Sequence, residues 1–203
     1  YSVPEALAWL RGVVRTMVRD WRIGYLKLDG PCMAHYHGGR FHEPGVTAVE
    51  QVRRSLAVIR EECGEDVLVE GEGLYGASIG FVDLQRTTQD THPCWHLLES
   101  GTPLLKENLG NDLLSSFLHG RLWHVHRENV VLRDFPSPFH AGKARNPGAV
   151  ESLLTENELR CQLSAAVLAG GAMLLTDPLP LLRRCPERFA LIGQFLPPYE
   201  GAR

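Results

Sequence analysis

The sequence has 203 residues, of which 44% are apolar and 22% charged, an ordinary balance for one globular domain or at most two. A net charge of −3 gives no reason to expect nucleic acid or an anionic membrane as a partner. The five cysteines form no C-x-x-C pair, which argues against a zinc ribbon or a disulfide framework. Their number and spacing instead favour a reducing compartment, and we expect a cytoplasmic protein.

The first predicted elements are a helix over residues 4–20 and a strand at Tyr25–Gly30. The strand alternates, so Lys27 and Asp29 lie on the same side, opposite Leu28. A charged pair at the end of an apolar strand is costly unless it is ion-paired or used in chemistry. Both interpretations of this pair remain open at this point.

The rest of the chain alternates between helices and strands. The periodicity predicts further helices over residues 47–62, 102–119, 155–169 and 180–191, and further strands over residues 66–70, 79–85, 122–132 and 172–176. This alternation implies a parallel sheet covered by helices. It fits a doubly wound sheet or part of an eight-stranded barrel, and we expect a single domain over residues 1–203.

Two loops follow predicted strands. Residues 31–45 contain several histidines directly after the strand that carries Asp29, and such strand-to-helix loops form the active-site face of α/β folds. Their spacing matches no zinc motif. Residues 71–80 are rich in glycine but lack the G-x-G-x-x-G arrangement of a dinucleotide site.

A second carboxylate, Asp90, ends the strand-like stretch 81–90. Two carboxylates delivered from two strand ends are the minimum equipment for glycoside hydrolysis. Lys27 would keep Asp29 ionised, because a nearby cation favours the charged form. Asp90 has uncharged neighbours, and burial would favour the protonated form that a general acid requires, whereas a close approach of Arg86 would oppose it.

A rival signal is His124-x-His126-x-Glu128. Alternation would place the three side chains on one side of a strand, and imidazole and carboxylate groups are good zinc ligands. A metal-dependent hydrolase on a barrel is therefore an alternative. A catalytically inactive barrel that binds sugar is a second alternative.

Four segments, in order, resemble the second half of the catalytic barrel of melibiase-type α-galactosidases, glycoside hydrolase family 36. They are residues 3–30, 76–95, 119–134 and 158–177. The resemblance implies a (β/α)8 TIM barrel of which this chain holds about five later strands, with the first three before Tyr1. Such a half-barrel should be poorly stable alone, because it leaves open edges and an uncovered core.

The resemblance also assigns roles. Asp29 matches the family's catalytic nucleophile and Asp90 its acid/base residue, while Lys27 and Arg86 match residues that contact the sugar. Trp95 is an aromatic residue that could stack on a sugar face or belong to the core. The implied activity is hydrolysis of terminal α-galactosyl residues of oligosaccharides by a retaining double displacement. No cofactor or metal is implied, and the full-length protein could form a homo-oligomer.

The sequence also departs from the family pattern. Val125-His126-Arg127-Glu128 stands where an Asn-Asp-Pro-Asp run is usual, and Gly71-Glu72 replaces a cysteine-glycine pair. Pro31 stands where the family often has asparagine. These changes concern the identity of the sugar more than the type of reaction.

Overall fold

The structure is a computed structural model that describes residues 2–30, 40–91, 95, 104–133, 154–177 and 179–195. The chain divides into two compact units, residues 1–86 with 120–124 (unit 1) and residues 87–119 with 125–203 (unit 2). Residues 31–39 of the histidine-containing loop, including Pro31, and the predicted helix start at 102–103 lie outside the described residues. No described helix is both long enough and apolar enough to cross a membrane.

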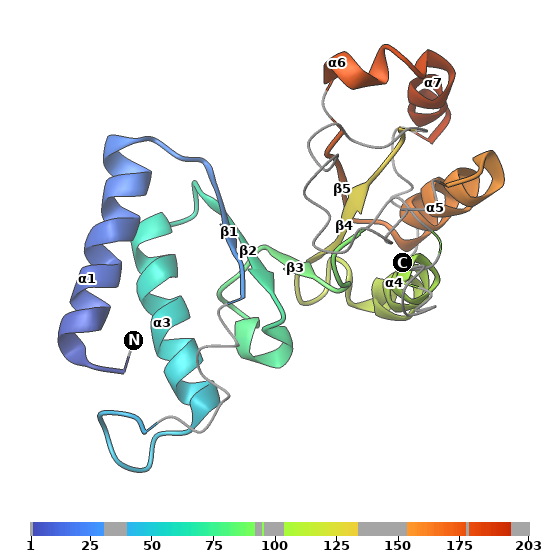
Figure 1. Cartoon of the computed structure of the whole chain (residues 1–203). Coiled ribbons are helices and arrows are strands. Elements are labelled where there is room, and N and C mark those ends of the chain that lie inside the picture. Colours follow the sequence, from blue (N-terminus) through green and yellow to red (C-terminus); the bar gives the residue numbers. More distant parts are fainter. Residues whose placement is uncertain are drawn as a thin grey trace, which may run out of the picture. The chain divides into compact units, whose positions relative to one another are not determined.

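Unit 1 contains the parallel strands β1 (Tyr25–Leu28), β2 (Leu68–Glu72) and β3 (Leu84–Arg86), in chain order (Figure 1). In their register Lys27 lies opposite Glu70, and Glu72 lies opposite Arg86. Partners in a parallel ladder point to the same side of the sheet, so one face carries a group of charged residues.

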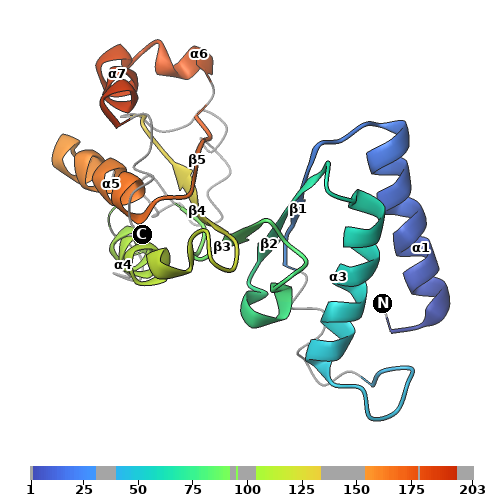
Figure 2. The ribbon, with the colours of Figure 1, turned by 180° about the vertical axis from the view of Figure 1, so that it is seen from behind.

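Two helices cover the other face. These are α1 (Pro4–Arg15), which continues as the π-helical segment η1 (Thr16–Asp20), and α3 (Ala48–Cys63). They lie side by side against the sheet in Figures 1 and 2. Apolar residues of α1, of α3 and of β2 with the segments before β2 and β3 form the buried core beneath them: Leu10, Val14, Val58, Ile59, Cys63, Val67, Val69 and Val82. The alternation predicted for the first strand is confirmed, because Leu26 and Leu28 pack on this core.

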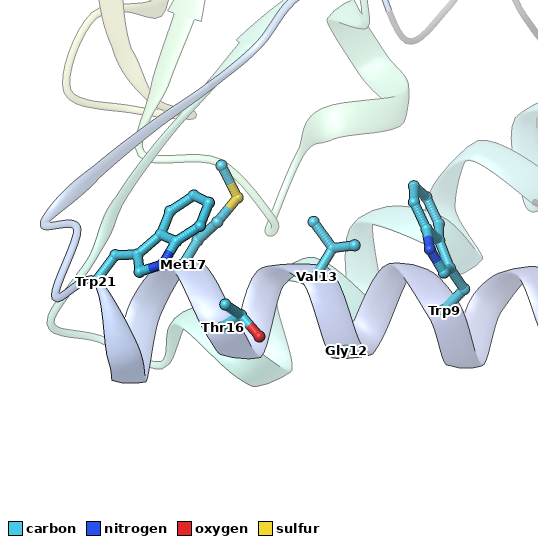
Figure 3. A pocket seen from close by; sticks show the side chains of 6 residues that line it. All are labelled: Trp9, Gly12, Val13, Thr16, Met17 and Trp21. Carbon is cyan, nitrogen blue, oxygen red and sulfur yellow. The ribbon is translucent and has the colours of Figure 1, made fainter.

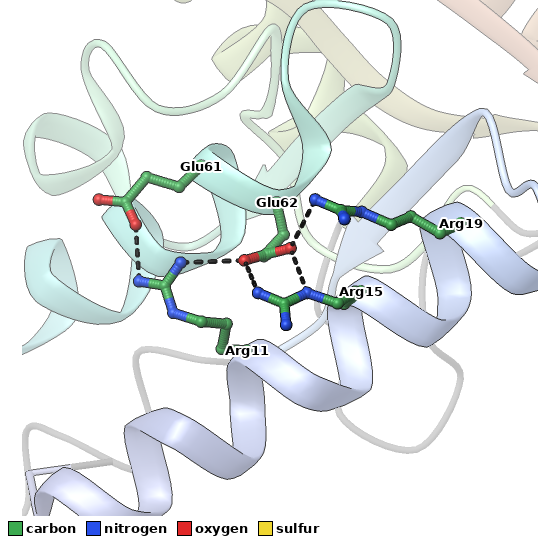
Figure 4. A network of polar contacts seen from close by, with 5 residues as sticks. All are labelled: Arg11, Arg15, Arg19, Glu61 and Glu62. Carbon is green, nitrogen blue, oxygen red and sulfur yellow. Dashed lines mark hydrogen bonds and ion pairs between the residues drawn. The ribbon is translucent and has the colours of Figure 1, made fainter.

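A charged network joins the same two helices (Figure 4). Glu62 of α3 accepts hydrogen bonds from Arg11 (3.0 Å) and Arg15 (2.8 and 3.0 Å), and it forms an ion pair with Arg19 (3.6 Å). Arg11 also bonds the more exposed Glu61. The arginines lie four residues apart, one helical turn, and therefore share the face of the helix that meets α3.

A second group of charged residues joins α3 to the amino-terminal ends of β2 and β3. Arg60 of α3 donates to the Phe81 carbonyl (2.8 Å) and forms an ion pair with Asp83 (2.6 Å). The Asp83 carboxylate also accepts from the Val69 amide (2.8 Å). One aspartate thus fixes the helix and two neighbouring strands at this end of the sheet.

Unit 2 contains most of β4 (His124–Val130), together with β5 (Ala172–Leu175), and these strands pair in parallel. The helix α4 (Leu104–Ser115), which ends in the 3-10 turn η3 (Ser116–Leu118), contacts α5 (Glu156–Ala169). Buried residues from the ends of β4, from α5 and from the last helical segment form the main core of this unit: Val130, Leu132, Leu159, Leu163, Cys185 and Leu191.

Local signals explain the helix starts. The predicted start of a helix at residue 155 is confirmed, and a capping box explains it: Thr155 accepts from the Glu158 amide and Glu158 reaches back to the Thr155 amide. Thr47 and Glu50 form a second capping box at α3.

The prediction of a single last helix is wrong. It divides into α6 (Leu179–Leu182) and α7 (Pro186–Phe195). Pro186 lacks an amide donor and favours the first turn of a new helix. The Cys185 carbonyl accepts the amides of Arg188 and Phe189 at that start.

Candidate active site

Four charged residues meet at the carboxyl-terminal ends of the three strands of unit 1. Lys27 lies on β1, Asp29 directly follows that strand, Glu72 ends β2 and Arg86 ends β3. Strand alternation and register place them on the face opposite α1 and α3. The carboxyl ends of parallel strands are where barrel enzymes build their active sites. The predicted cluster of Lys27, Asp29 and Arg86 is therefore brought together through a residue that the sequence analysis did not assign.

Glu72 is the centre of this cluster. Its carboxylate forms an ion pair with Arg86 (2.8 Å) and another with Lys27 (3.5 Å). It also makes a hydrogen-bonding contact with the Asp29 carboxyl group. Burial and then this contact raise the pKa of Glu72, while the positive charge of Arg86 acts in the opposite direction.

The four side chains differ in burial. Only 2% of the Arg86 side chain is exposed, whereas Asp29 and Lys27 are exposed. Asp29 is therefore open to a reaction partner, and the buried Arg86 is held by its ion pair with Glu72. A buried guanidinium needs such an anionic partner, because a buried charge without one is strongly destabilising.

A further polar contact lies on the same face, one step back along the strands. Glu70 of β2 is fully buried and accepts a hydrogen bond from the Tyr25 hydroxyl group. The predicted strand at 66–70 is thus displaced, because β2 extends to Glu72 and carries two inward-facing glutamates. Their alternation, Glu-Gly-Glu, was the signal in the sequence that could have found Glu72.

Gly71, between these glutamates, allows β2 to pack closely on the opposite face. A Cβ atom at this position would lie 3.0 Å from Gln85 Oε1, 3.1 Å from Leu74 and 3.2 Å from Val82. These neighbours would have to move for any other residue. The tight packing fixes the backbone that places Glu72.

The other predicted carboxylate, Asp90, lies in unit 2, four residues after β3, and is exposed. Burial, the condition that would favour its protonated form, is therefore not met among the described residues. Its neighbour Gln89 is held by Asn108 of α4, which accepts from the Gln89 amide (3.2 Å) and donates to its carbonyl (3.0 Å). Thr88 donates to the Arg127 carbonyl (2.8 Å). The segment that carries Asp90 is thus attached to both α4 and β4.

Trp95, the aromatic candidate, and two further aromatic residues have different surroundings. Trp95 is half-buried and packs against a cluster in unit 2 formed by Leu105, Leu109, Leu154 and Ala165. In unit 1, Trp123 is buried and Tyr75, in the 3-10 turn η2 (Tyr75–Ser78), is exposed. The contacts that the structure describes for Trp95 are therefore core contacts.

The rival cluster of histidines and a glutamate does not form a common face. His124 is exposed, whereas His126 and Glu128 are buried. The register of β4 shifts between His126 and Asn129, and Glu128 has a φ of 73°, so a bulge breaks the expected alternation. Within the described ranges, no group of three or more His, Cys, Asp or Glu residues could hold a metal ion.

Asp177, which follows β5, has a structural environment. Its carboxylate accepts the backbone amides of Leu132 and Arg133 and forms an ion pair with the Arg133 side chain. It is buried and joins the segment after β4 to the segment after β5. These contacts give Asp177 a structural role.

A groove of about 490 Å³ lies along α1 and η1, lined by Trp9, Gly12, Val13, Thr16, Met17 and Trp21 (Figure 3). Its lining contains no ionisable side chain. Acid–base chemistry at this groove therefore has no residue to perform it, and the charged cluster remains the candidate active site.

No protein-family model matches the sequence. The solved structures to which the chain is similar are glycoside hydrolases. One is TtGalA, an alpha-galactosidase from Thermus thermophilus, in complex with stachyose, with 25% identity and a TM-score of 0.71 over 96% of this chain. The same enzyme in complex with p-nitrophenyl alpha-D-galactopyranoside gives 25% identity and a TM-score of 0.72 over 97% of the chain. This chain spans 38% and 37% of those two chains.

A third structure, the Arthrobacter globiformis T6 isomalto-dextranase complexed with panose, gives a TM-score of 0.54 at 16% identity. The match covers 91% of this chain and 30% of the isomalto-dextranase chain, and it supports the fold alone. The predicted barrel class and the predicted likeness to an α-galactosidase are confirmed by these comparisons. The likeness extends over part of such an enzyme.

Proposed function

We propose that this chain carries active-site strands of a retaining α-galactosidase, which hydrolyses terminal α-galactosyl residues of oligosaccharides. The observation that carries the proposal is the meeting of Asp29, Lys27 and Arg86 at the carboxyl edge of β1–β3, through Glu72. The likeness to TtGalA supports the choice of sugar.

In the proposed reaction, a carboxylate oxygen of Asp29 attacks the anomeric carbon while the bond to the leaving oxygen breaks. Asp90 donates its proton to that oxygen. Asp90 then takes a proton from water, whose oxygen attacks the anomeric carbon and releases Asp29. Lys27 and Arg86 bind the galactose hydroxyl groups, and Trp95 flanks the sugar.

Two substitutions test the assignment of the carboxylates. We expect Asp29→Asn to lower the turnover of p-nitrophenyl α-galactoside by at least about 1,000-fold. Asp90→Asn should lower the turnover of stachyose by roughly 100-fold or more, and that of the nitrophenyl substrate less, because nitrophenolate leaves without protonation.

Azide provides the sharper test. In the Asp29→Gly variant, azide should occupy the place of the missing nucleophile and yield β-galactosyl azide. In the unsubstituted protein without azide, the first product of hydrolysis should be α-galactose. Proton NMR of the anomeric signals distinguishes these products. Galactose binding without any turnover would instead support the inactive sugar-binding barrel.

We also propose a cytoplasmic location and a sugar as the small-molecule partner. The described cysteines Cys63 and Cys161 are free thiols, which supports a reducing compartment. Mass spectrometry of the alkylated protein from intact cells would test this, since disulfide-bonded cysteines would escape alkylation.

A further inference from the structure

Glu72 is a third carboxylate in the candidate active site, next to the two that the proposed reaction uses. It ends β2, between the strands that carry Lys27 and Arg86, and it forms ion pairs with both. Its side chain is 21% exposed, so its exposure is intermediate between that of the buried Arg86 and that of the exposed Asp29.

Glu72 lies between the two cations of this edge and contacts both of them. Lys27 and Asp29 face it from β1, Arg86 faces it from β3, and Glu70 lies two residues earlier on its own strand. Lys27 and Arg86 provide two positive charges, and Asp29 provides one negative charge. The Glu72 carboxylate lies 3.5 Å from the Lys27 ammonium group and 2.8 Å from the Arg86 guanidinium group.

We propose that Glu72 is a positioning residue, whose carboxylate holds the Lys27 ammonium and the Arg86 guanidinium beside Asp29, ready for the hydroxyl groups of a neutral sugar. This inference rests on the proposed function, in which the same two cations bind galactose. A long lysine side chain loses rotational freedom when it binds, and an ion pair formed beforehand lowers that cost at the moment of binding.

The arrangement also makes sugar binding depend on pH. Burial and the contact with Asp29 raise the pKa of Glu72 above that of an ordinary glutamate. As the pH falls through this raised pKa, Glu72 becomes neutral and holds the two cations less firmly. We therefore expect the affinity for galactose to fall toward acid pH.

The test is calorimetric titration of galactose onto the unsubstituted protein and onto Glu72→Gln, between pH 4 and pH 8. We expect Glu72→Gln to bind galactose about tenfold more weakly at pH 7, because the substitution removes one strong charge-assisted contact. The decrease of affinity toward acid pH should also disappear. The matched control is Asp83→Asn, which removes an ion-paired carboxylate at the opposite ends of the strands and should leave affinity and its pH dependence unchanged.

A second readout needs no sugar. Nitrogen-15 NMR of the Lys27 Nζ and Arg86 Nε groups should follow the titration of Glu72 in the unsubstituted protein and should be flat over that range in Glu72→Gln. If the unsubstituted protein neither binds nor hydrolyses galactosides, the proposed function fails, and this readout still decides the role of Glu72. Signals of both cations that are unchanged by Glu72→Gln would overturn the inference.

Discussion

Asp112 of α4 is a buried carboxylate whose protonation state responds to pH near neutrality. It is 2% exposed, lies 3.4 Å from the Thr87 hydroxyl group and is influenced by the charge of Arg127. Burial raises the pKa of Asp112 to about 7, although Arg127 and Thr87 act in the opposite direction. Because the unfolded chain would release this proton near the ordinary value, the neutral form is the one that favours folding.

We predict that Asp112 titrates near pH 7 in the folded protein, and carbon-13 NMR of its carboxyl group measures this directly. The stabilisation from its raised pKa is complete below the ordinary value of 3.8 and is lost as the pH rises through about 7. Asp112→Asn identifies the signal and should remove this contribution to the pH dependence. A midpoint near pH 4 would contradict the prediction.

At the scale of whole elements, the docking of α1 on α3 depends on one glutamate. Hydrogen bonds from Arg15 lower the pKa of Glu62 to about 2, against the cost of its burial. A lowered pKa stabilises the folded state above the ordinary value of 4.5, and this stabilisation is lost as the pH falls through about 2.

We predict that Glu62→Gln makes the amides of α1 exchange with deuterium about tenfold faster at pH 7, since a half-exposed ion-pair network contributes modestly. The difference from the unsubstituted protein should shrink between pH 4.5 and pH 2, after correction for intrinsic exchange rates. Glu61→Gln is the matched control, because Glu61 is 59% exposed and bonds Arg11 alone within the network in Figure 4. Equal effects of the two substitutions would refute the prediction.

The sequence predicted most elements because each has a local cause. The α5 start follows from Thr155 and Glu158, and the order of helices and strands follows from hydrophobic periodicity. The extent of β2 was missed, because Glu70 and Glu72 are unusual strand residues that the sheet accepts only with Tyr25, Lys27 and Arg86 as partners. Those partners come from other strands, and no local pattern contains them.

At the scale of the whole molecule, the described part of the chain has five strands, whereas the resemblance implies an eight-stranded barrel. A partial barrel leaves strand edges and apolar side chains without cover. We predict that the isolated 203-residue chain shows no sharp cooperative transition in scanning calorimetry. A single transition with equal calorimetric and van't Hoff enthalpies would count against this.

The group of Arg60 and Asp83 lies at the opposite ends of the strands from Asp29 and Glu72. Anchoring and chemistry thus occupy different ends of the same short strands. A lineage could exchange residues at the chemical end, as the glutamate at position 72 illustrates, while the anchored end preserved the scaffold. Substitutions that change the sugar bound would then have little effect on folding. We therefore expect sequence variation among natural relatives to concentrate at the carboxyl-terminal ends of the strands.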